Sequence, residues 1–208
     1  MWRIFGVILR TMNGSKYAPQ DTSDLLDFFK NKSDLTQCFT YKDTSSLQKI
    51  LPKDNDLTII YISTFHQAYK ATFEGIKNLK GEKLLLVNLQ QNEIKNKTDD
   101  ISKYIKENLT DDSKTTVILS NQSYEKAQES DMWKNSAFTE AILQGLKDGL
   151  ADGYNTDNQQ DNIITINELF EYLSETLPQL ARESKADNLQ HPVLLNNVLG
   201  DLGIHIIH

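Results

Sequence analysis

The sequence predicts a single α/β domain over residues 1–208, in which helices cover both faces of a mostly parallel sheet. Two observations lead to this fold class. Short apolar runs alternate along the chain with amphipathic stretches, which is typical of βαβ units. The chain has 208 residues, with 38% hydrophobic and 25% charged, which is enough for one domain with a sizeable core and argues against disorder.

Five short apolar runs are predicted to form strands. They occupy residues 2–9, 35–41, 57–62, 84–87 and 115–119. The third and fourth runs, LTIIYI and LLLV, are apolar at nearly every position, as expected of strands that are buried on both faces of a sheet. A last apolar run at residues 204–207 closes the chain.

Helices are predicted where apolar residues recur at helical spacing between these runs. The first helix is expected to start at Asp21-Thr22-Ser23, whose side-chain oxygens can cap a helix N-terminus, and to carry Leu25 and Phe29. Further helices are expected at residues 44–51, 69–79, 94–109, 138–146 and 169–177.

Composition excludes several classes of function. The formal net charge is -7, and nucleic-acid binding is not expected because it needs a basic face. The single cysteine, Cys38, excludes an internal disulfide and a cysteine-ligated metal site, and it fits a reducing compartment, so we expect a cytoplasmic protein. No apolar stretch approaches the ~20 residues that span a bilayer, so no membrane partner is expected.

The second half of the chain contains short motifs in a fixed order. They are Ala127-Gln128-Glu129, Phe138-Thr139, the Leu-x-Gly-Leu step at residues 143–146, Ala151-Asp152, the T-x-x-E-L-x-x-Y segment that starts at Thr165, and Gln190-His191-Pro192. This order resembles the C-terminal half of the caspase and metacaspase-like cysteine peptidases, the peptidase C14 group. The resemblance extends to the first half by the order of strands and helices, and it implies a caspase-like three-layer sandwich.

In that family, two neighbouring core strands end in the catalytic histidine and cysteine, at the carboxyl edge where open α/β sheets place their sites. The family segments are serine-glycine-histidine-glycine and aspartate-alanine-cysteine. The corresponding segments here are Ser63-Thr64-Phe65-His66 and Val87-Asn88-Leu89. Phe65 therefore stands at the position of the histidine and Leu89 at that of the cysteine. An alignment shifted by one residue would place His66 at the histidine position.

These replacements remove the chemistry of a cysteine peptidase. Amide hydrolysis by this route needs a thiolate and a nearby imidazole. Leu89 has no nucleophile, and residues 90–92, which are Gln, Gln and Asn, carry amides. We therefore expect no catalytic residue and no cofactor. Cys38 would be a relocated nucleophile, but it falls in the second predicted strand, and single cysteines are usually small buried hydrophobes.

A candidate calcium site consists of Asp157, Asp161 and Glu168. These residues occupy the first, fifth and twelfth positions of a loop with the length of an EF-hand loop. Asn162 stands at the sixth position, where the sharp turn of an EF-hand needs glycine. The competing interpretation is a capping box, in which Thr165 and Glu168 each pair with a backbone amide at a helix start. We favour the capping box and expect no bound metal.

The sequence thus predicts a caspase-like pseudopeptidase that binds rather than cleaves. Loss of the nucleophile leaves the cleft and the sheet edges available for recognition. A protein or peptide is the expected partner, and an active caspase-like homologue is one candidate. The resemblance implies that two such domains can pair through a sheet edge to form a dimer. Two alternatives remain open: an active cysteine peptidase with rearranged catalytic residues, and a scaffold domain from a larger signalling protein.

Overall fold

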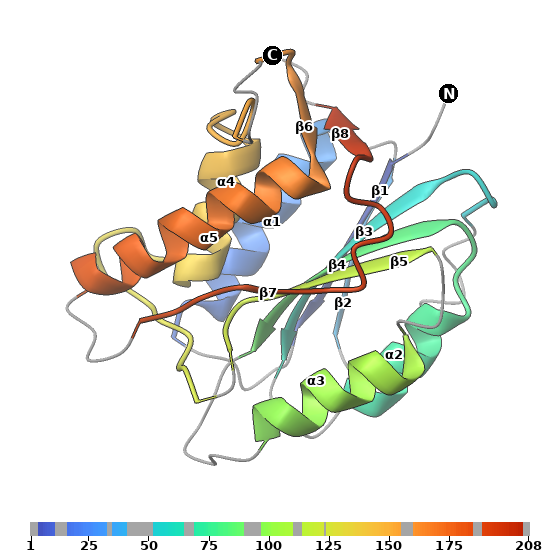
Figure 1. Ribbon diagram of the computed structural model, residues 1–208, viewed down its shortest axis with the longest axis horizontal. Helices are drawn as coiled ribbons and strands as arrows, with labels where there is room; N and C mark the ends of the chain where they lie inside the picture. Colours follow the sequence, from blue (N-terminus) through green and yellow to red (C-terminus); the bar gives the residue numbers. More distant parts are fainter. Residues whose placement is uncertain are drawn as a thin grey trace.

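The chain folds around a mostly parallel six-stranded sheet with helices on both faces (Figure 1). This mixed α/β architecture, seen in a computed structural model, confirms the fold class expected from the alternation of apolar and amphipathic stretches. The structure describes residues 4–10, 16–32, 35–40, 52–64, 69–89, 97–109, 114–122, 124–154, 160–184 and 189–205. No helix within these ranges is both long and apolar enough to cross a membrane.

The strand order across the main sheet is β2-β1-β3-β4-β5-β7. Neighbouring strands from β2 to β5 are parallel, whereas β7 pairs antiparallel with β5. The bounds are Ile4–Arg10 (β1), Leu35–Thr40 (β2), Leu57–Thr64 (β3), Glu82–Leu89 (β4), Thr115–Leu119 (β5) and Val193–Leu195 (β7). Two short antiparallel strands, Ile163–Thr165 (β6) and Gly203–His205 (β8), form a separate pair.

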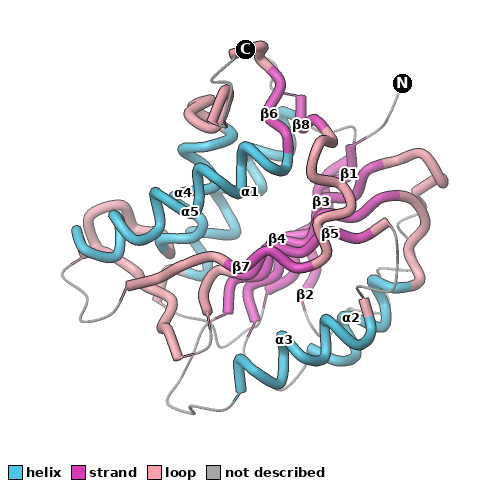
Figure 2. Tube along the Cα trace, in the orientation of Figure 1, coloured by secondary structure: helices cyan, strands magenta, loops and turns pink. Residues whose placement is uncertain are grey.

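The helices form one layer on each face of the main sheet (Figure 2). One layer contains α1 (Ala18–Lys32), α4 (Ala137–Leu146) and α5 (Ile166–Glu183), and the other contains α2 (Tyr69–Lys77) and α3 (Lys97–Asn108). The core is accordingly divided into two hydrophobic clusters, which we call the α1/α4/α5 cluster and the α2/α3 cluster.

Strand β4 contributes to both clusters by simple alternation. Leu84 and Leu86 belong to the α1/α4/α5 cluster, whereas Leu85 and Val87 belong to the α2/α3 cluster. Successive side chains of a strand point to opposite faces, so a strand covered on both faces is apolar at consecutive positions. The four consecutive apolar residues of the LLLV run therefore indicate a strand in the middle of the sheet.

All five predicted strands are confirmed, and β3 and β4 each extend two residues beyond the predicted carboxyl end. The helices predicted after residue 68 correspond to α2, α3, α4 and α5. The short helix predicted at residues 44–51 lies outside the described residues. Strands β6 and β7 were not predicted because each has three residues, too few to show a period-two pattern.

The turn before β4 requires a glycine. Gly81 has a φ of +78°, and a Cβ atom there would lie 2.4 Å from the carbonyl oxygen of Asp56. That carbonyl oxygen also accepts the N–H of Glu82 at 2.9 Å, so it cannot move away without breaking the entry into β4. The side chain of Asp56 fixes the same turn by accepting the N–H of Lys53 at 2.6 Å.

Replacing this glycine tests how β4 is positioned. Gly81→Ala combines a left-handed backbone with a clash against a backbone oxygen, so we expect the free energy of unfolding to fall by about 2 kcal/mol or more. Urea denaturation measures the loss. The control is Lys80→Ala, which alters an exposed neighbour and should change stability by less than about 0.5 kcal/mol. Equal effects of the two substitutions would contradict the described turn.

Candidate functional site

The carboxyl ends of β3 and β4 lie side by side, as the parallel pairing requires. Thr64 is the register partner of Leu89, and Ser63 is the register partner of Asn88. Phe65 and His66 follow directly in sequence but lie outside the described residues. The carboxyl edge of a parallel sheet is where α/β proteins build their sites, so these strand ends define the candidate site.

Leu89 ends β4 with its side chain in the α2/α3 cluster, and the residue is only 2% exposed. Its backbone N–H donates to the Oγ atom of Ser120 at 2.9 Å. Ser120 in turn donates from Oγ to the Oδ1 atom of Asn121 at 2.5 Å and is itself fully buried. The position that the resemblance assigns to the cysteine is therefore part of the packed core, and the adjacent hydroxyl is occupied by hydrogen bonds.

Asn88 precedes Leu89 and, by the alternation of the strand, points to the opposite face. Its Nδ2 atom donates to the hydroxyl of Tyr61 at 3.0 Å and to the Oγ atom of Ser136 at 2.9 Å. Tyr61 contacts Thr139 Oγ1 at 2.8 Å and donates to Asp21 Oδ2 at 3.4 Å. These five side chains, all fully buried, form a polar cluster that we call the junction cluster.

The junction cluster joins the starts of two helices to the two central strands. Ser136 is the N-cap of α4, and its Oγ atom accepts the backbone N–H of Thr139 at 3.2 Å. The backbone N–H of Ser136 donates to Asp21 Oδ1 at 2.8 Å, across 115 positions of sequence. Asp21 lies in the first turn of α1. One carboxylate therefore ties the start of α4 to the start of α1.

Burial dominates the acid–base behaviour of this cluster. Burial raises the pKa of the Asp21 carboxyl from 3.8 to about 7, although hydrogen bonds from Ser136 oppose the rise. The negative charge of Glu129 raises it slightly further. Burial, followed by the nearby Asp21 charge, also raises the pKa of the Tyr61 hydroxyl well above its usual value. Tyr61 is consequently neutral at physiological pH, whereas Asp21 changes its charge within that range.

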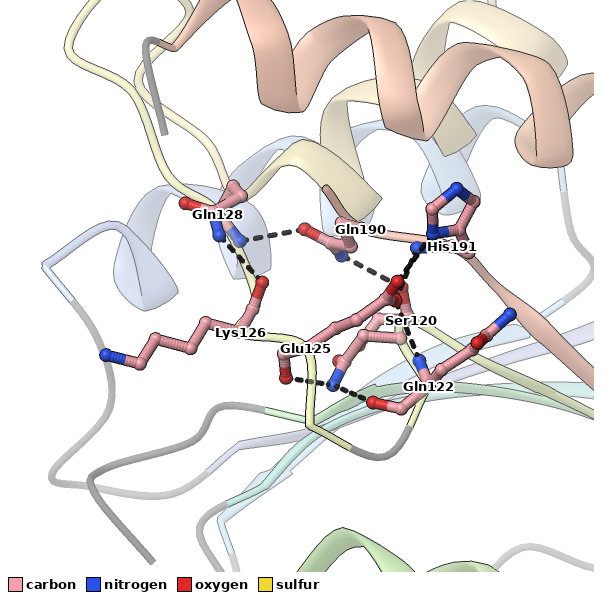
Figure 3. A network of polar contacts seen from close by, with 8 residues as sticks. Ser120, Gln122, Glu125, Lys126, Gln128, Gln190 and His191 are labelled. Atoms are coloured by element: carbon pink, nitrogen blue, oxygen red, sulfur yellow. Dashed lines mark hydrogen bonds and ion pairs between the residues drawn. The ribbon is translucent and has the colours of Figure 1, made fainter. Parts of the chain in front are cut away.

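A second polar network connects the end of β5 to the segment before β7 (Figure 3). Gln190 donates from Nε2 to the carbonyl oxygen of Ser120 at 2.9 Å and accepts the backbone N–H of Gln128 at 2.8 Å. Glu125 accepts the backbone N–H of His191 at 2.7 Å and also pairs with its ring Nδ1 atom. These contacts fix the loop after β5 beside the candidate site.

Two buried polar atoms of the site have no hydrogen-bond partner among the described residues. They are the Oγ atom of Ser63 and the Oδ1 atom of Asn88. Because Ser63 and Asn88 are register partners on parallel strands, both side chains belong to the same face and the same edge. Buried polar groups usually have partners, since leaving one unpaired costs about 1–3 kcal/mol. The pair therefore leaves two polar atoms unsatisfied at the carboxyl edge of β3 and β4.

The calcium candidate is not supported by its geometry. Glu168 is almost fully buried, and its oxygens accept the backbone N–H groups of Gly153 at 3.0 Å and of Thr165 at 2.7 Å. The predicted capping box with Thr165 is confirmed. Asp161 accepts the N–H of Ile163 at 2.9 Å, and Asp157 lies outside the described residues. Within the described ranges, no group of three or more His, Cys, Asp or Glu side chains is arranged to hold a metal ion.

The sequence did not reveal the role of Asp21. The expectation that Asp21-Thr22-Ser23 caps α1 is wrong, because α1 begins at Ala18 and the Asp21 carboxylate binds the start of α4 instead. One signal was present: Asp21, Leu25 and Phe29 recur at four-residue spacing, which puts an acid on the buried stripe of the helix. The partner Ser136 has no local signature.

Comparison with models of known protein families finds no matching family. Comparison with curated proteins finds no matching sequence.

The raised pKa of Asp21 predicts a pH dependence of stability. The folded state keeps this proton up to about pH 7, whereas the unfolded chain releases it near 3.8, so stability should fall as the pH rises through that window and level off above it. The difference between the two pKa values corresponds to on the order of 4 kcal/mol. Asp21→Asn has no proton to release, so its stability should not show this fall. The difference in free energy of unfolding between Asp21→Asn and the wild type should therefore grow in favour of the variant by on the order of 4 kcal/mol between pH 4 and 8.

Urea denaturation at a series of pH values measures this difference. The matched control is Asp24→Asn, on the same helix, where the carboxylate accepts a surface hydrogen bond from Gln20. The control should follow the wild-type curve. Parallel curves for Asp21→Asn and the wild type would contradict the described burial of the carboxyl.

Proposed function

We propose that this chain is a catalytically inactive caspase-type domain that binds a peptide or an extended protein segment at the carboxyl edge of its sheet. The observation that carries the proposal is the position of Leu89. It ends β4 at the edge where the resemblance places the cysteine, and its side chain is packed into the α2/α3 cluster. An apolar core residue at this point is compatible with recognition but not with covalent catalysis.

The absence of a nucleophile does not depend on one alignment. A shift by one residue would place Gln90, an amide, at the cysteine position. Cys38 lies on β2, with β1 and β3 between it and β4. Three strand spacings of about 4.8 Å put it on the order of 14 Å from Leu86, the β4 residue level with it, and further still from Leu89 at the end of β4. The alternative of an active peptidase with a relocated cysteine is therefore the weaker one.

The neighbouring hydroxyl is equally unsuited to attack a substrate. Ser120 lies beside Leu89, but its Oγ atom accepts the N–H of Leu89 and donates to Asn121. It is fully buried, and no described histidine contacts it. A serine becomes nucleophilic when an adjacent base takes its proton, and here the proton is held by an amide oxygen, which is not a base at neutral pH.

The unpartnered atoms of Ser63 and Asn88 support binding at this edge. An extended peptide offers backbone N–H and C=O groups at regular spacing. These can pair with the Ser63 hydroxyl and the Asn88 carbonyl when binding opens the strand ends, since both atoms are buried in the ligand-free chain. The free chain carries the free-energy cost of two unpaired buried groups. A ligand that pairs with them removes this cost, which adds to its binding free energy. These two unpartnered atoms are the reason to propose that a binding site remains at this edge, although Leu89 fills the position assigned to the nucleophile.

The residues that carry the family resemblance support the proposal through their positions. Phe138 and Thr139 lie in the first turn of α4, and Thr139 is a member of the junction cluster. Gly145 lets α5 approach, since a Cβ atom there would lie 3.1 Å from the ring of Tyr172. Gln190 holds the loop after β5. These three motifs thus position α4, α5 and the loop after β5.

Pairing with a second caspase-type domain would use an outer strand of the sheet. The outer strands among those described are β2 and β7. Strand β7 has only three residues and directly follows Pro192, which has no N–H to donate. Short edges that begin with proline resist strand pairing. We therefore place peptide recognition at the carboxyl edge ahead of pairing with a homologue through β7.

A Ser63→Ala variant tests the proposal. It removes an unpaired buried hydroxyl, so the protein should be as stable as the wild type or slightly more stable. Fluorescence polarisation measures binding to a library of short extended peptides with acidic, basic and neutral side chains. We expect the wild type to bind at least one class saturably, and Ser63→Ala to bind the same peptides with about tenfold lower affinity. The matched control is Thr58→Val, which removes another unpaired buried hydroxyl from β3, six positions away from the edge that contains Thr64. The control should bind as the wild type does.

The same peptides, followed by mass spectrometry, test the absence of catalysis. We expect no cleavage by the wild type. Cleavage that Cys38→Ala abolishes would establish the active-peptidase alternative and refute the proposal. Failure of every peptide class to bind would refute peptide recognition and favour the scaffold alternative.

A further inference from the structure

We infer that the junction cluster is a proton-controlled switch, in which the protonation of Asp21 reverses a chain of hydrogen bonds and thereby exchanges the acceptor that Asn88 presents at the site for a donor. The inference rests on geometry. Asp21, Tyr61, Thr139 and Ser136 form a continuous series of hydroxyl and carboxyl contacts, and Asn88 bridges two of them. All five side chains are fully buried.

With Asp21 ionised, all the hydroxyl protons point towards the carboxylate. Ser136 Oγ donates to Thr139 Oγ1 at 3.0 Å. Thr139 then donates to the Tyr61 oxygen at 2.8 Å, and Tyr61 donates to Asp21 Oδ2 at 3.4 Å. The oxygens of Tyr61 and Ser136 are left as acceptors, so Asn88 must direct its Nδ2 atom to both. Its Oδ1 atom is buried and has no described partner.

A proton on Asp21 redirects these hydrogen bonds. The new Asp21 O–H donates to the Tyr61 oxygen, so the Tyr61 proton needs another acceptor. Asn88 supplies it when its amide turns over, because Oδ1 then faces the Tyr61 and Ser136 oxygens that Nδ2 faced before, and Nδ2 takes the place of Oδ1. Tyr61 and Ser136 both donate to Oδ1, Thr139 still donates to Tyr61, and the contact between Ser136 and Thr139 is left without a proton. The heavy atoms stay in place except those of the amide, which rotates about one bond.

The charged and titratable groups around Asp21 allow this proton to be taken up near neutral pH. Glu129, in the segment that leads to α4, adds negative charge and favours the protonated form. Tyr61 is the titratable group that β3 brings to the cluster, and its pKa is raised well above the usual value, so it remains neutral. On β1, Arg10 is the register partner of Ser63, and its side chain is outside the described part of the structure.

No described cation pairs with Asp21. On α1 itself, Asp24 accepts a hydrogen bond from Gln20 at the surface, and Lys16, just before the helix, pairs with Asp131. The carboxyl is thus surrounded by neutral donors and by burial, and both protonation states are accessible. Its pKa of about 7 agrees with this environment.

The switch changes what the site can bind. Above neutral pH, the Asn88 carbonyl oxygen favours ligands that donate an N–H, and below neutral pH the amide favours carbonyl or carboxylate oxygens. This consequence rests on the proposed function, whereas the reversal itself can be measured without any ligand. An experiment can therefore refute the reversal without refuting peptide binding, and the converse also holds.

Nuclear magnetic resonance of the ligand-free chain tests the reversal between pH 5.5 and 8.5. The side-chain carboxyl carbon of Asp21 should titrate near neutral pH. With the same midpoint, nuclear Overhauser contacts of the Asn88 amide protons should move from the Tyr61 ring and Ser136 Hβ protons at high pH to the Ser63 Hβ protons at low pH. The side-chain amide of Asn78, which donates to the carbonyl oxygen of Glu74 on α2, is the internal reference and should keep its contacts throughout.

Two variants separate the switch from a simple effect of charge. In Asp21→Asn, the amide donates to Tyr61 as the protonated acid would, so Asn88 should show the low-pH contacts at every pH. In Tyr61→Phe, the chain is cut, so Asp21 should still titrate while the contacts of Asn88 stay constant. Titration of Asp21 in the wild type without any change in the Asn88 contacts would overturn the inference. A carboxyl midpoint below pH 5 would overturn it as well.

Discussion

The hydrogen bond from the backbone N–H of Ser136 to the carboxylate of Asp21 is the contact on which the rest of this arrangement depends. It joins the first turn of α1 to the N-cap of α4 at 2.8 Å, in a position sealed from solvent. An ionised carboxylate without a cation is costly to bury, and the hydrogen bonds from Ser136 and Thr139 reduce that cost without removing it. The part of the desolvation cost that remains raises the pKa of the Asp21 carboxyl to about 7. The same contact thus provides both the fixed geometry of the site and its sensitivity to protons.

The alternation of side chains along β4 separates two properties of the candidate site. Leu89 faces the α2/α3 cluster and fills the position that the resemblance assigns to a nucleophile, whereas Asn88 faces the junction cluster and leaves one oxygen unpaired. In the proposed function, recognition therefore depends on the face of β4 that carries Asn88, and it does not require a nucleophile on the other face.

Sequence reasoning succeeded where the cause of a structure is local. The strand at residues 84–87 was predictable because burial on both faces requires consecutive apolar residues, and the capping box was predictable because Thr165 and Glu168 are three positions apart. It failed where the cause is distant. The partner of Asp21 is 115 positions away in the sequence. The position of this acid on an apolar helical stripe indicates that it is buried, but not which residue it binds. Strand β7 is defined by its pairing with β5, not by its own three residues.

Hydrogen exchange at the backbone amide of Ser136 tests the central claim most directly. If the buried Asp21 carboxylate holds this N–H, exchange should require opening of the α1–α4 contact and should be among the slowest in the chain. The amide of Met132, four positions earlier, provides the fast reference because Met132 is exposed and its N–H donates to the Ser130 hydroxyl at the surface. The account predicts at least about a thousandfold slower exchange at Ser136, corresponding to roughly 4 kcal/mol. Similar exchange rates for the two amides would contradict it.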